Sequence, residues 1–313
     1  MDFKINLSST YFFIINILFI LLSLLMSYFL LRKKNDSSLE SDTDLKFYEK
    51  SYLYKGPNFI YNTIIAMILK VYGDGNLEIE KNFYKSKSGE EKISYELKNL
   101  NSDALDPAEK KLFQILFSFE EDKISTRTLD RLRRTEPDNY NKKFNEFIYF
   151  LEDDMVLKKL LTKEKKTFKI LISFVIFSLL FFIGVISVYN EKFFGAISII
   201  LSLVFYASLI SSFSKMTALG NKKFKELEKV EEDLCKCKVS KSDDFLLALA
   251  FGLKAENLKA LYEKLIFENK INKDYQIFFD SEFYTIFKKA LVGDHLLVRN
   301  HNHRLSRWFV LPL

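Results

Sequence analysis

The sequence predicts an integral membrane protein that is mainly α-helical with a minor β-hairpin. Three apolar runs without a charged residue, at positions 11–31, 170–189 and 193–213, each have the roughly 20 residues that a helix needs to cross about 30 Å of hydrocarbon. The charged regions at 45–167 and 214–293 are long enough to form small folded domains. Helical periodicity dominates both regions, and one pair of alternating segments in the first of them predicts the hairpin.

These observations predict a definite order of parts. We expect a short extracytoplasmic N-terminus (1–10), a transmembrane helix (11–31), a linker (32–44), a cytoplasmic α+β domain (45–167), a second transmembrane helix (168–189), an extracytoplasmic turn (190–192), a third transmembrane helix (193–213), a cytoplasmic helical domain (214–293) and a tail (294–313).

The orientation follows from the positive charges beside the spans, because cytoplasmic flanks are enriched in Lys and Arg. Basic residues follow the first span, precede the second and follow the third: Arg32, Lys33, Lys34, Lys158, Lys159, Lys163, Lys165, Lys166, Lys215, Lys222, Lys223, Lys225 and Lys229. The turn at 190–192 carries one Lys and one Glu. We therefore expect a multi-pass cell-membrane protein with its N-terminus outside and its C-terminus in the cytoplasm.

The first span is interpreted as a retained anchor, with a cleaved signal peptide as the alternative. A signal peptide has a positive amino end, an apolar stretch of about 7 to 15 residues and a small-residue cleavage site. Here the run is about 21 residues long and its basic cluster, Arg32 to Lys34, lies on the other side.

The pattern of the first soluble region predicts a helix, a hairpin and then three helices. Apolar residues at helical spacing from Phe59 to Val71 end at a Gly-Asp-Gly-Asn stretch, and alternating segments around Leu77 and Tyr95 flank a turn at 85–91. Asp106 begins the next helix as its cap, with Pro107 in the first turn and Glu109 three residues on. Ser125 or Thr126 caps a short helix, and a longer one follows Pro137. This order is reminiscent of winged-helix folds.

The second soluble region reads as a small helical bundle. It begins with an amphipathic helix at about 217–238. The apolar run from Phe245 to Leu253 is too short to span a bilayer, so we expect either a buried or an interfacial helix there.

This layout resembles the bacterial predicted membrane protein family known as domain of unknown function 2207. The resemblance is carried by the step Gly75-Asn76-Leu77-Glu78-Ile79, the helix from Glu109 to Phe117 before a transmembrane hairpin, and the apolar run ending at Gly252 after it. It covers about residues 11–293. Family members usually carry a large extracellular β-rich region before the anchor, and this sequence shows no counterpart. The resemblance supports the fold and implies no activity.

No group of residues has the spacing of a catalytic, metal or cofactor site, so we expect no cofactor and no enzyme activity. All three histidines lie in the tail, without the further ligands of a closed zinc site. Cys235 and Cys237 lack the spacing of a redox pair and any second pair for zinc. Gly73 and Gly75 follow a helix, which is the wrong context for a dinucleotide loop.

Small residues four apart on the third span predict a helix-packing face. The pairs are Ser198 with Ser202 and Ala207 with Ser211, and such spacings let another helix approach closely. Chance produces them as well. Besides the lipid bilayer, we therefore expect a protein partner, or a homo-oligomer formed through the transmembrane hairpin.

Arg127, Arg131 and Arg134 recur at helical spacing and form a candidate basic surface. A solvated face, attraction to anionic lipid headgroups and contacts with nucleic-acid phosphates all remain open. Nucleic acid is the least favoured of these, because the hairpin follows the recognition helix in ordinary DNA-binding winged helices. We expect a non-catalytic membrane-anchored scaffold or accessory subunit, and the alternative is a membrane-tethered nucleic-acid regulator.

Overall fold

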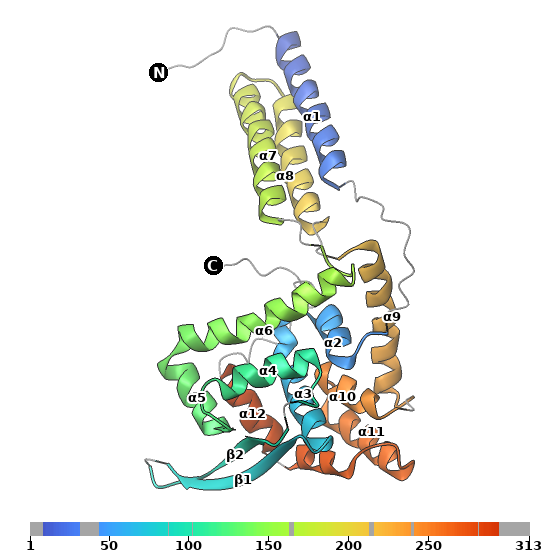
Figure 1. Cartoon of the computed structure of the whole chain (residues 1–313). Helices are drawn as coiled ribbons and strands as arrows, with labels where there is room; N and C mark the ends of the chain where they lie inside the picture. Colours follow the sequence, from blue (N-terminus) through green and yellow to red (C-terminus); the bar gives the residue numbers. More distant parts are fainter. Residues whose placement is uncertain are drawn as a thin grey trace. The chain divides into compact units, whose positions relative to one another are not determined.

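A computed structural model of the chain is shown in Figure 1. It describes residues 9–31, 44–86, 88–101, 103–162, 166–212, 216–238, 241–280 and 282–293, and the predicted tail 294–313 lies outside them. Contacts divide the chain into two compact units. We call Met1–Glu40 with Thr162–Thr217 the apolar unit, and Ser41–Leu161 with Ala218–Leu313 the α+β unit.

The apolar unit consists of three helices that contact one another: α1 (Ser9–Leu31), α7 (Lys166–Tyr189) and α8 (Phe194–Ser212). Within the described residues, the stretches Thr10–Tyr28 and Ile170–Tyr189 are long and apolar enough to cross a membrane, and Phe194–Tyr206 is a shorter apolar stretch. Gly184 and Gly195 let α7 and α8 approach closely, since a Cβ on Gly195 would lie 2.5 Å from the carbonyl oxygen of Gly184.

The α+β unit is mainly helical, with one small antiparallel sheet. Its elements from the first soluble region are α2 (Phe47–Lys55), η1 (Pro57–Phe59), α3 (Ile60–Gly73), β1 (Leu77–Lys85), β2 (Glu91–Asn99), α4 (Pro107–Phe117), β3 (Lys123–Ser125), α5 (Thr126–Thr135) and α6 (Pro137–Leu157). Those from the second are α9 (Ala218–Cys235), α10 (Ser242–Ala250), α11 (Ala255–Phe267), η2 (Lys273–Phe279) and α12 (Phe283–Val292). The predicted helix, hairpin and three helices are present, while α2 and β3 were not predicted. The likeness to winged-helix folds stays a prediction.

The sheet has the strand order β1-β2-β3. The nine residues of β1 pair with all nine of β2, from Leu77 opposite Asn99 to Lys85 opposite Glu91. The short β3 pairs only with Glu96, Leu97 and Lys98. The inner half of the hairpin is therefore a three-stranded sheet, and its outer half is a two-stranded ribbon.

The predicted cap at Asp106 is confirmed. Its carboxylate accepts hydrogen bonds from the N–H groups of Ala108 and Glu109, both at 2.9 Å, and the Glu109 carboxylate accepts the Asp106 N–H at 3.1 Å. Burial opposes ionisation of Asp106, but the Glu109 N–H and the Lys46 ammonium outweigh it and hold the pKa of this carboxyl below its usual value. At α5 the cap is Ser125, whose hydroxyl accepts the Thr128 N–H at 3.0 Å.

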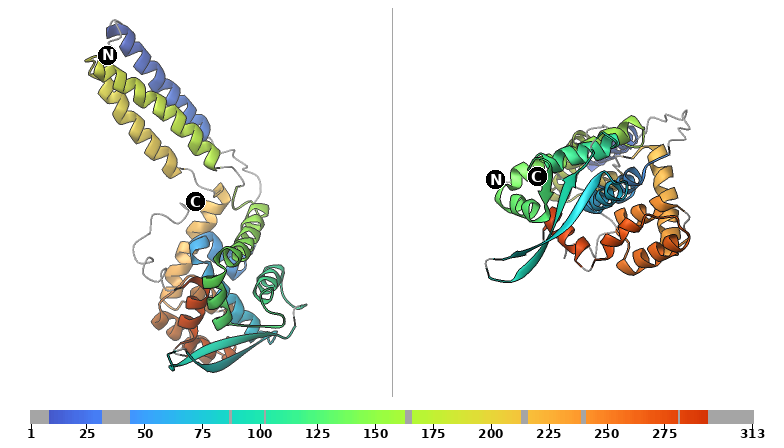
Figure 2. Two further views of the ribbon diagram at one scale, coloured as in Figure 1. Left: turned by 90° about the vertical axis from the view of Figure 1, so that its left-hand side faces the viewer. Right: turned by 60° about the horizontal axis from the view of Figure 1, so that its bottom comes forward.

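The two soluble regions, expected as separate domains, share one core. The helix predicted at 245–253 is buried, with Phe245 to Phe251 at most 4% exposed, and α10 packs against α2 and α3. The Ser51 hydroxyl donates to the Ala250 carbonyl at 3.1 Å, and the Tyr140 hydroxyl donates to the Leu291 carbonyl at 3.1 Å. Figures 1 and 2 show the red α12 beside elements from the first half of the chain.

Charged side chains inside the α+β unit are paired. Glu49, 3% exposed, lies 2.5 Å from the Lys158 ammonium, and Lys55 contacts Glu231. Lys70 lies 2.8 Å from Glu109. Burial opposes the charge of Lys70, but its ion pairs with Glu109 and Asp74 prevail and hold its pKa above the usual value. Removal of one partner would strand a buried charge, so these pairs are part of the fold.

Truncation of Phe287 in α12 should destabilise the hairpin. Its ring is fully buried, 5.8 Å from that of Tyr95 in β2, and Phe→Ala at such a site costs about 3 to 5 kcal/mol. We expect Phe287→Ala to accelerate hydrogen exchange in β2 as well as in α12, measured on the full chain in nanodiscs. Phe267→Ala, at a ring 89% exposed on α11, is the control. Faster exchange confined to α12 would mean that the two regions unfold separately.

Candidate functional site

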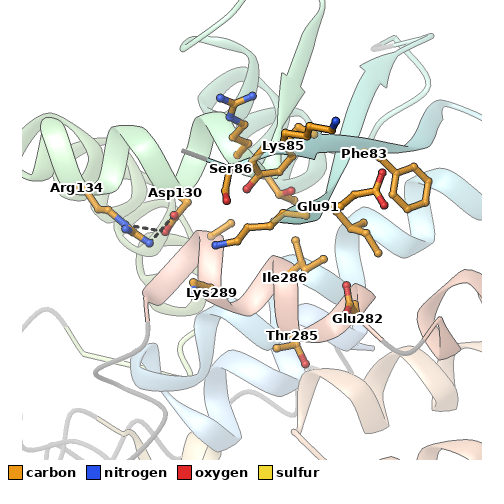
Figure 3. A pocket seen from close by; sticks show the side chains of 16 residues that line it. Phe83, Lys85, Ser86, Glu91, Asp130, Arg134, Glu282, Thr285, Ile286 and Lys289 are labelled. Carbon is orange, nitrogen blue, oxygen red and sulfur yellow. Dashed lines mark hydrogen bonds and ion pairs between the residues drawn. The ribbon is translucent and has the colours of Figure 1, made fainter. Parts of the chain in front are cut away.

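An open groove of about 840 Å³ lies beside the outer half of the hairpin. Its walls are β2 and the tip of β1, the exposed side of α5, and α12 (Figure 3). We call it the hairpin groove. Its lining residues are Phe83, Tyr84, Lys85, Ser86, Glu91, Lys92, Ile93, Thr126, Arg127, Asp130, Arg134, Glu282, Thr285, Ile286, Lys289 and Ala290.

The groove exists because β3 is short. The chain leaves the sheet at Thr126, where α5 begins, and the Thr126 hydroxyl accepts the N–H of Tyr95 at 3.0 Å. From Glu91 to Ile93 the outer edge of β2 therefore has no strand beside it in the described part of the chain. An open strand edge presents main-chain donors and acceptors to whatever enters the groove.

The lining of the groove carries more positive than negative charge. Five of its side chains are basic and three are acidic: Lys85, Lys92, Arg127, Arg134 and Lys289 against Glu91, Asp130 and Glu282. Asp130 is also bound by Arg133, at 2.6 Å, from outside the lining. The groove is thus suited to a ligand with negative charge.

The structure brings together two of the three arginines of the predicted basic surface. Arg127 lies over the Tyr84 ring, 4.4 Å from its centroid, and Arg134 lies 2.7 Å from an Asp130 oxygen. Both line the groove. Arg131 is not part of the lining and lies 3.7 Å from Glu120. Whether the three residues bind a partner stays a prediction.

The base of the hairpin is tied to the segment before α12. The Lys81 ammonium donates to Asp280 at 2.6 Å, and this contact lowers the pKa of the Asp280 carboxyl. Tyr95 packs edge-on against Phe283, with ring centroids 5.0 Å apart. These contacts hold the hairpin against α12 and the segment before it, so the position of β2 relative to α12 in the groove is set by the packing of the fold.

Sequence reasoning missed three of the basic lining residues. Lys85 begins the predicted turn and Lys92 follows it, in a place where lysines are ordinarily solvated, and Lys289 is 155 residues beyond Arg134 in the numbering. Only the packing of α12 on α5 and β2 brings them to one place. A signal that could have placed Lys85 and Lys92 near each other was the pairing of the hairpin strands, which puts Lys85 opposite Glu91 at the tip.

A second polar cluster lies inside the apolar unit, around Asn16 of α1. Its side-chain amide donates to the Ser187 hydroxyl of α7 at 2.7 Å and to the Phe12 carbonyl at 2.8 Å. Its carbonyl oxygen accepts from the Ser198 hydroxyl of α8. Asn16, Ser187 and Ser198 are at most 2% exposed. One asparagine therefore connects all three helices.

Of the predicted helix-packing face, Ser198 contacts a helix of the same chain. Ser202 is 2% exposed and donates to the Ile199 carbonyl of its own helix at 2.7 Å. The side chains of Ala207 and Ser211 lie outside the described residues. Asn16 is uncharged, so the absence of charged residues that predicted the spans gave no sign of it. An oligomer formed through this hairpin stays a prediction.

The thiols and carboxylates elsewhere form no further site in the described residues. Cys235 is exposed and Cys237 is half-buried, and both are free thiols. No group of three or more His, Cys, Asp or Glu side chains that could hold a metal ion occurs in the part of the chain that the structure describes. The histidines His295, His301 and His303 lie outside that part.

The fold defines a class before any comparison: a mainly helical protein with a small antiparallel sheet and two candidate apolar spans. Residues 49–247 match the family model described as "Predicted membrane protein (DUF2207) C-terminal domain". The chain therefore belongs to this family of predicted membrane proteins, whose function is unknown. The match begins in α2 and ends in α10, a narrower range than the residues 11–293 expected from the resemblance. No curated protein and no solved structure matches the chain.

Replacement of Asn16 by Leu should weaken the attachment of α1 to α7 and α8, because it removes both hydrogen bonds between helices. Such bonds contribute about 0.6 to 2 kcal/mol each. We expect residues 1–43, expressed as a separate tagged chain, to copurify with residues 44–313, and Asn16→Leu to reduce the recovery. Leu18→Ala, at a side chain 57% exposed within the apolar unit, is the control. Equal recovery of the parent, the Asn16→Leu variant and the Leu18→Ala variant would mean that apolar packing alone holds the helices together.

Proposed function

We propose that this protein is a non-catalytic, membrane-anchored interaction subunit. Three helices hold it in the membrane, with the N-terminus outside, and the α+β unit in the cytoplasm binds a partner protein in the hairpin groove. The observation that carries the proposal is the groove itself, which combines an open strand edge with a basic lining.

The shared core supports three spans over two. Residues 41–161 and 218–313 fold into one unit and must lie on the same side of the membrane. The chain between them therefore crosses an even number of times, so α7 needs a return path if it crosses. The adjoining α8, 19 residues long and apolar, supplies that path. The positive charges beside the spans favour the cytoplasm for the α+β unit.

The pairing of buried charges supports an interaction role over a catalytic one. Glu49, Glu109 and Lys55 each lie against an opposite charge that belongs to another element of the fold. A catalytic acid or base needs a substrate within hydrogen-bond reach, and these groups are committed to structural ion pairs.

The second candidate function is a membrane-tethered nucleic-acid regulator. The gathering of Arg127 and Arg134 with three lysines beside the hairpin favours it. Against it, Arg134 is paired with Asp130 and Arg131 with Glu120. An isolated fragment 44–161 is no suitable test, because it lacks α10 and α12, so DNA binding should be measured with the full chain.

A membrane-impermeant maleimide tests the orientation in intact cells. We expect the native thiols Cys235 and Cys237 to react only after the cells are permeabilised. Burial and the nearby Glu231 raise the pKa of the Cys235 thiol, so the labelling needs a mildly alkaline pH. With both cysteines replaced by Ser, Lys192→Cys in the turn between α7 and α8 should react in intact cells. The reverse pattern would place the α+β unit outside.

Crosslinking in native membranes, followed by extraction of the tagged full chain, tests the interaction role. We expect stoichiometric recovery of a partner protein and at least a tenfold loss with Arg127→Glu and Lys92→Glu together, because the two new negative charges then repel an acidic ligand. Lys259→Glu, on the exposed side of α11, is the control for a charge reversal outside the groove. Recovery of this protein alone, with salt-sensitive binding of duplex DNA, would replace the proposal by the nucleic-acid reading.

A further inference from the structure

We propose that the hairpin groove receives an extended segment of a partner protein in which acidic and apolar residues alternate, and that this segment pairs with β2 as an added strand. The inference rests on the proposed function and names the chemistry of the partner.

The edge of β2 offers main-chain groups for pairing. In an antiparallel strand, successive residues direct their N–H and C=O groups to opposite edges. Tyr95 and Asn99 direct theirs away from β1, because their N–H groups donate to Thr126 at 3.0 Å and to the Asp122 carbonyl at 3.1 Å. By the same alternation, Ile93 and Glu91 point their N–H and C=O groups into the groove.

The added strand would lie where β3 would be if it were longer. β3 pairs with Glu96 to Lys98, the Thr126 hydroxyl accepts the Tyr95 N–H, and the groove begins at Ile93. Three residues of β2 remain, which span about 10 Å at roughly 3.3 Å per residue. A short extended segment completes this edge as strands do in other edge-adding complexes, where main-chain hydrogen bonds supply affinity and alternate side chains supply specificity.

The two sides of the groove differ in chemistry. Ser94 lies 3.4 Å from Thr126 of α5 and Arg127 lies over Tyr84, so the even-numbered residues of the hairpin face α5. On this side are Lys92, Arg127 and Arg134. Tyr95 packs on Phe283 and Phe287, so the odd-numbered residues face α12.

The α12 side supplies apolar surface. Ile93 and Ile286 line it, and Phe83, 62% exposed, lies opposite Ile93 in the hairpin register. Side chains of an added strand alternate between the two sides. Side chains directed to α5 therefore meet mainly cations. Those directed to α12 meet Phe83, Ile93 and Ile286, beside two basic and two acidic residues whose charges balance: Lys85, Lys289, Glu91 and Glu282. This arrangement favours alternating acidic and apolar residues.

A polypeptide fits this edge better than a nucleic acid. The N–H and C=O groups of Ile93 need an acceptor and a donor at strand spacing. A sugar–phosphate backbone offers phosphate acceptors to Lys92 and Arg127 but no regular donors for the C=O groups. Duplex DNA would thus bind to the basic side chains and leave the main-chain groups of the β2 edge unpaired. Loss of the Ile93 N–H should therefore weaken the binding of a peptide and leave the binding of DNA unchanged.

The test uses the full chain in nanodiscs and a labelled, end-capped peptide of about six residues, the usual strand length, in which Glu and Val alternate. We expect saturable binding measured by fluorescence anisotropy. Ile93→Pro should weaken it at least about tenfold, because proline removes an N–H that points to the groove while the bonds to β1 remain. Ile93→Val keeps the N–H and should bind as the parent does.

Two further probes keep the test decisive even if Ile93→Pro disturbs the hairpin. The same peptide with N-methyl groups on alternate residues should lose binding, because it cannot pair as a strand. A peptide that alternates Lys and Val should not bind. Equal binding of the methylated or the lysine peptide would overturn the inference, and so would no binding of the Glu–Val peptide.

The competing occupants give different results. Duplex DNA that displaces the peptide and binds Ile93→Pro unchanged would overturn the inference in favour of a nucleic acid. Self-association that is lost with Ile93→Pro would overturn it in favour of a second copy. If crosslinking recovers a partner but the Glu–Val peptide does not bind, only the added strand is excluded. If crosslinking recovers no partner and the peptide does not bind, the proposed function is excluded as well.

Discussion

The packing of α10 and α12 against α3 and β2 is the interaction on which the rest of the structure depends. Residues Ile64 to Leu69 of α3 are at most 1% exposed, so this helix needs apolar neighbours on every side. The chain before Leu161 supplies α2 and β1, and the chain after Ala218 supplies α10 and α12. The two apolar helices α7 and α8 are thus an insertion into a single fold. Each large apolar side chain buried there contributes roughly 1.5 to 3 kcal/mol, and both halves of the chain supply such side chains to the one core.

The same packing explains the hairpin groove. Tyr95, with Phe283 and Phe287 packed against its ring, lies next to the inner end of the groove, which begins at Ile93. Beyond it the hairpin continues as two strands, because β3 stops at Ser125 and α5 turns away. The groove is the space left between that ribbon and the two helices that hold its base. Its shape and its charges therefore follow from the shared core, although its lining comes from three separate stretches of the chain.

The sequence predicted local structure well and long-range packing poorly. The cap at Asp106, the hairpin with its turn and a helix at about 245–253 were all predicted, because each is set by neighbours within a few residues. The sequence left open whether that helix is buried or interfacial, because its packing partners α2 and α3 are far away in the chain. The union of the two soluble regions was not predicted, because the apolar stretches between them suggested a domain boundary. β3 was also missed, since Lys123 to Ser125 is too short for a period-two pattern. Of the groove, only Arg127 and Arg134 were predicted, and their helical spacing was the local signal.

Because of Asn16, α1 needs its contacts with α7 and α8 more than those two helices need their contacts with α1. In hydrocarbon an amide without partners costs several kcal/mol, and α1 alone satisfies only part of Asn16 through the Phe12 carbonyl. Ser187 already donates to the Ile183 carbonyl of its own helix at 2.9 Å, and a serine can satisfy its hydroxyl in this way wherever it lies on a helix. Separation of the helices therefore costs α1 more than it costs α7 and α8. The hydrogen bonds of Asn16 therefore tie α1 to both of its neighbours, and the retention of α1 as an anchor stays a prediction.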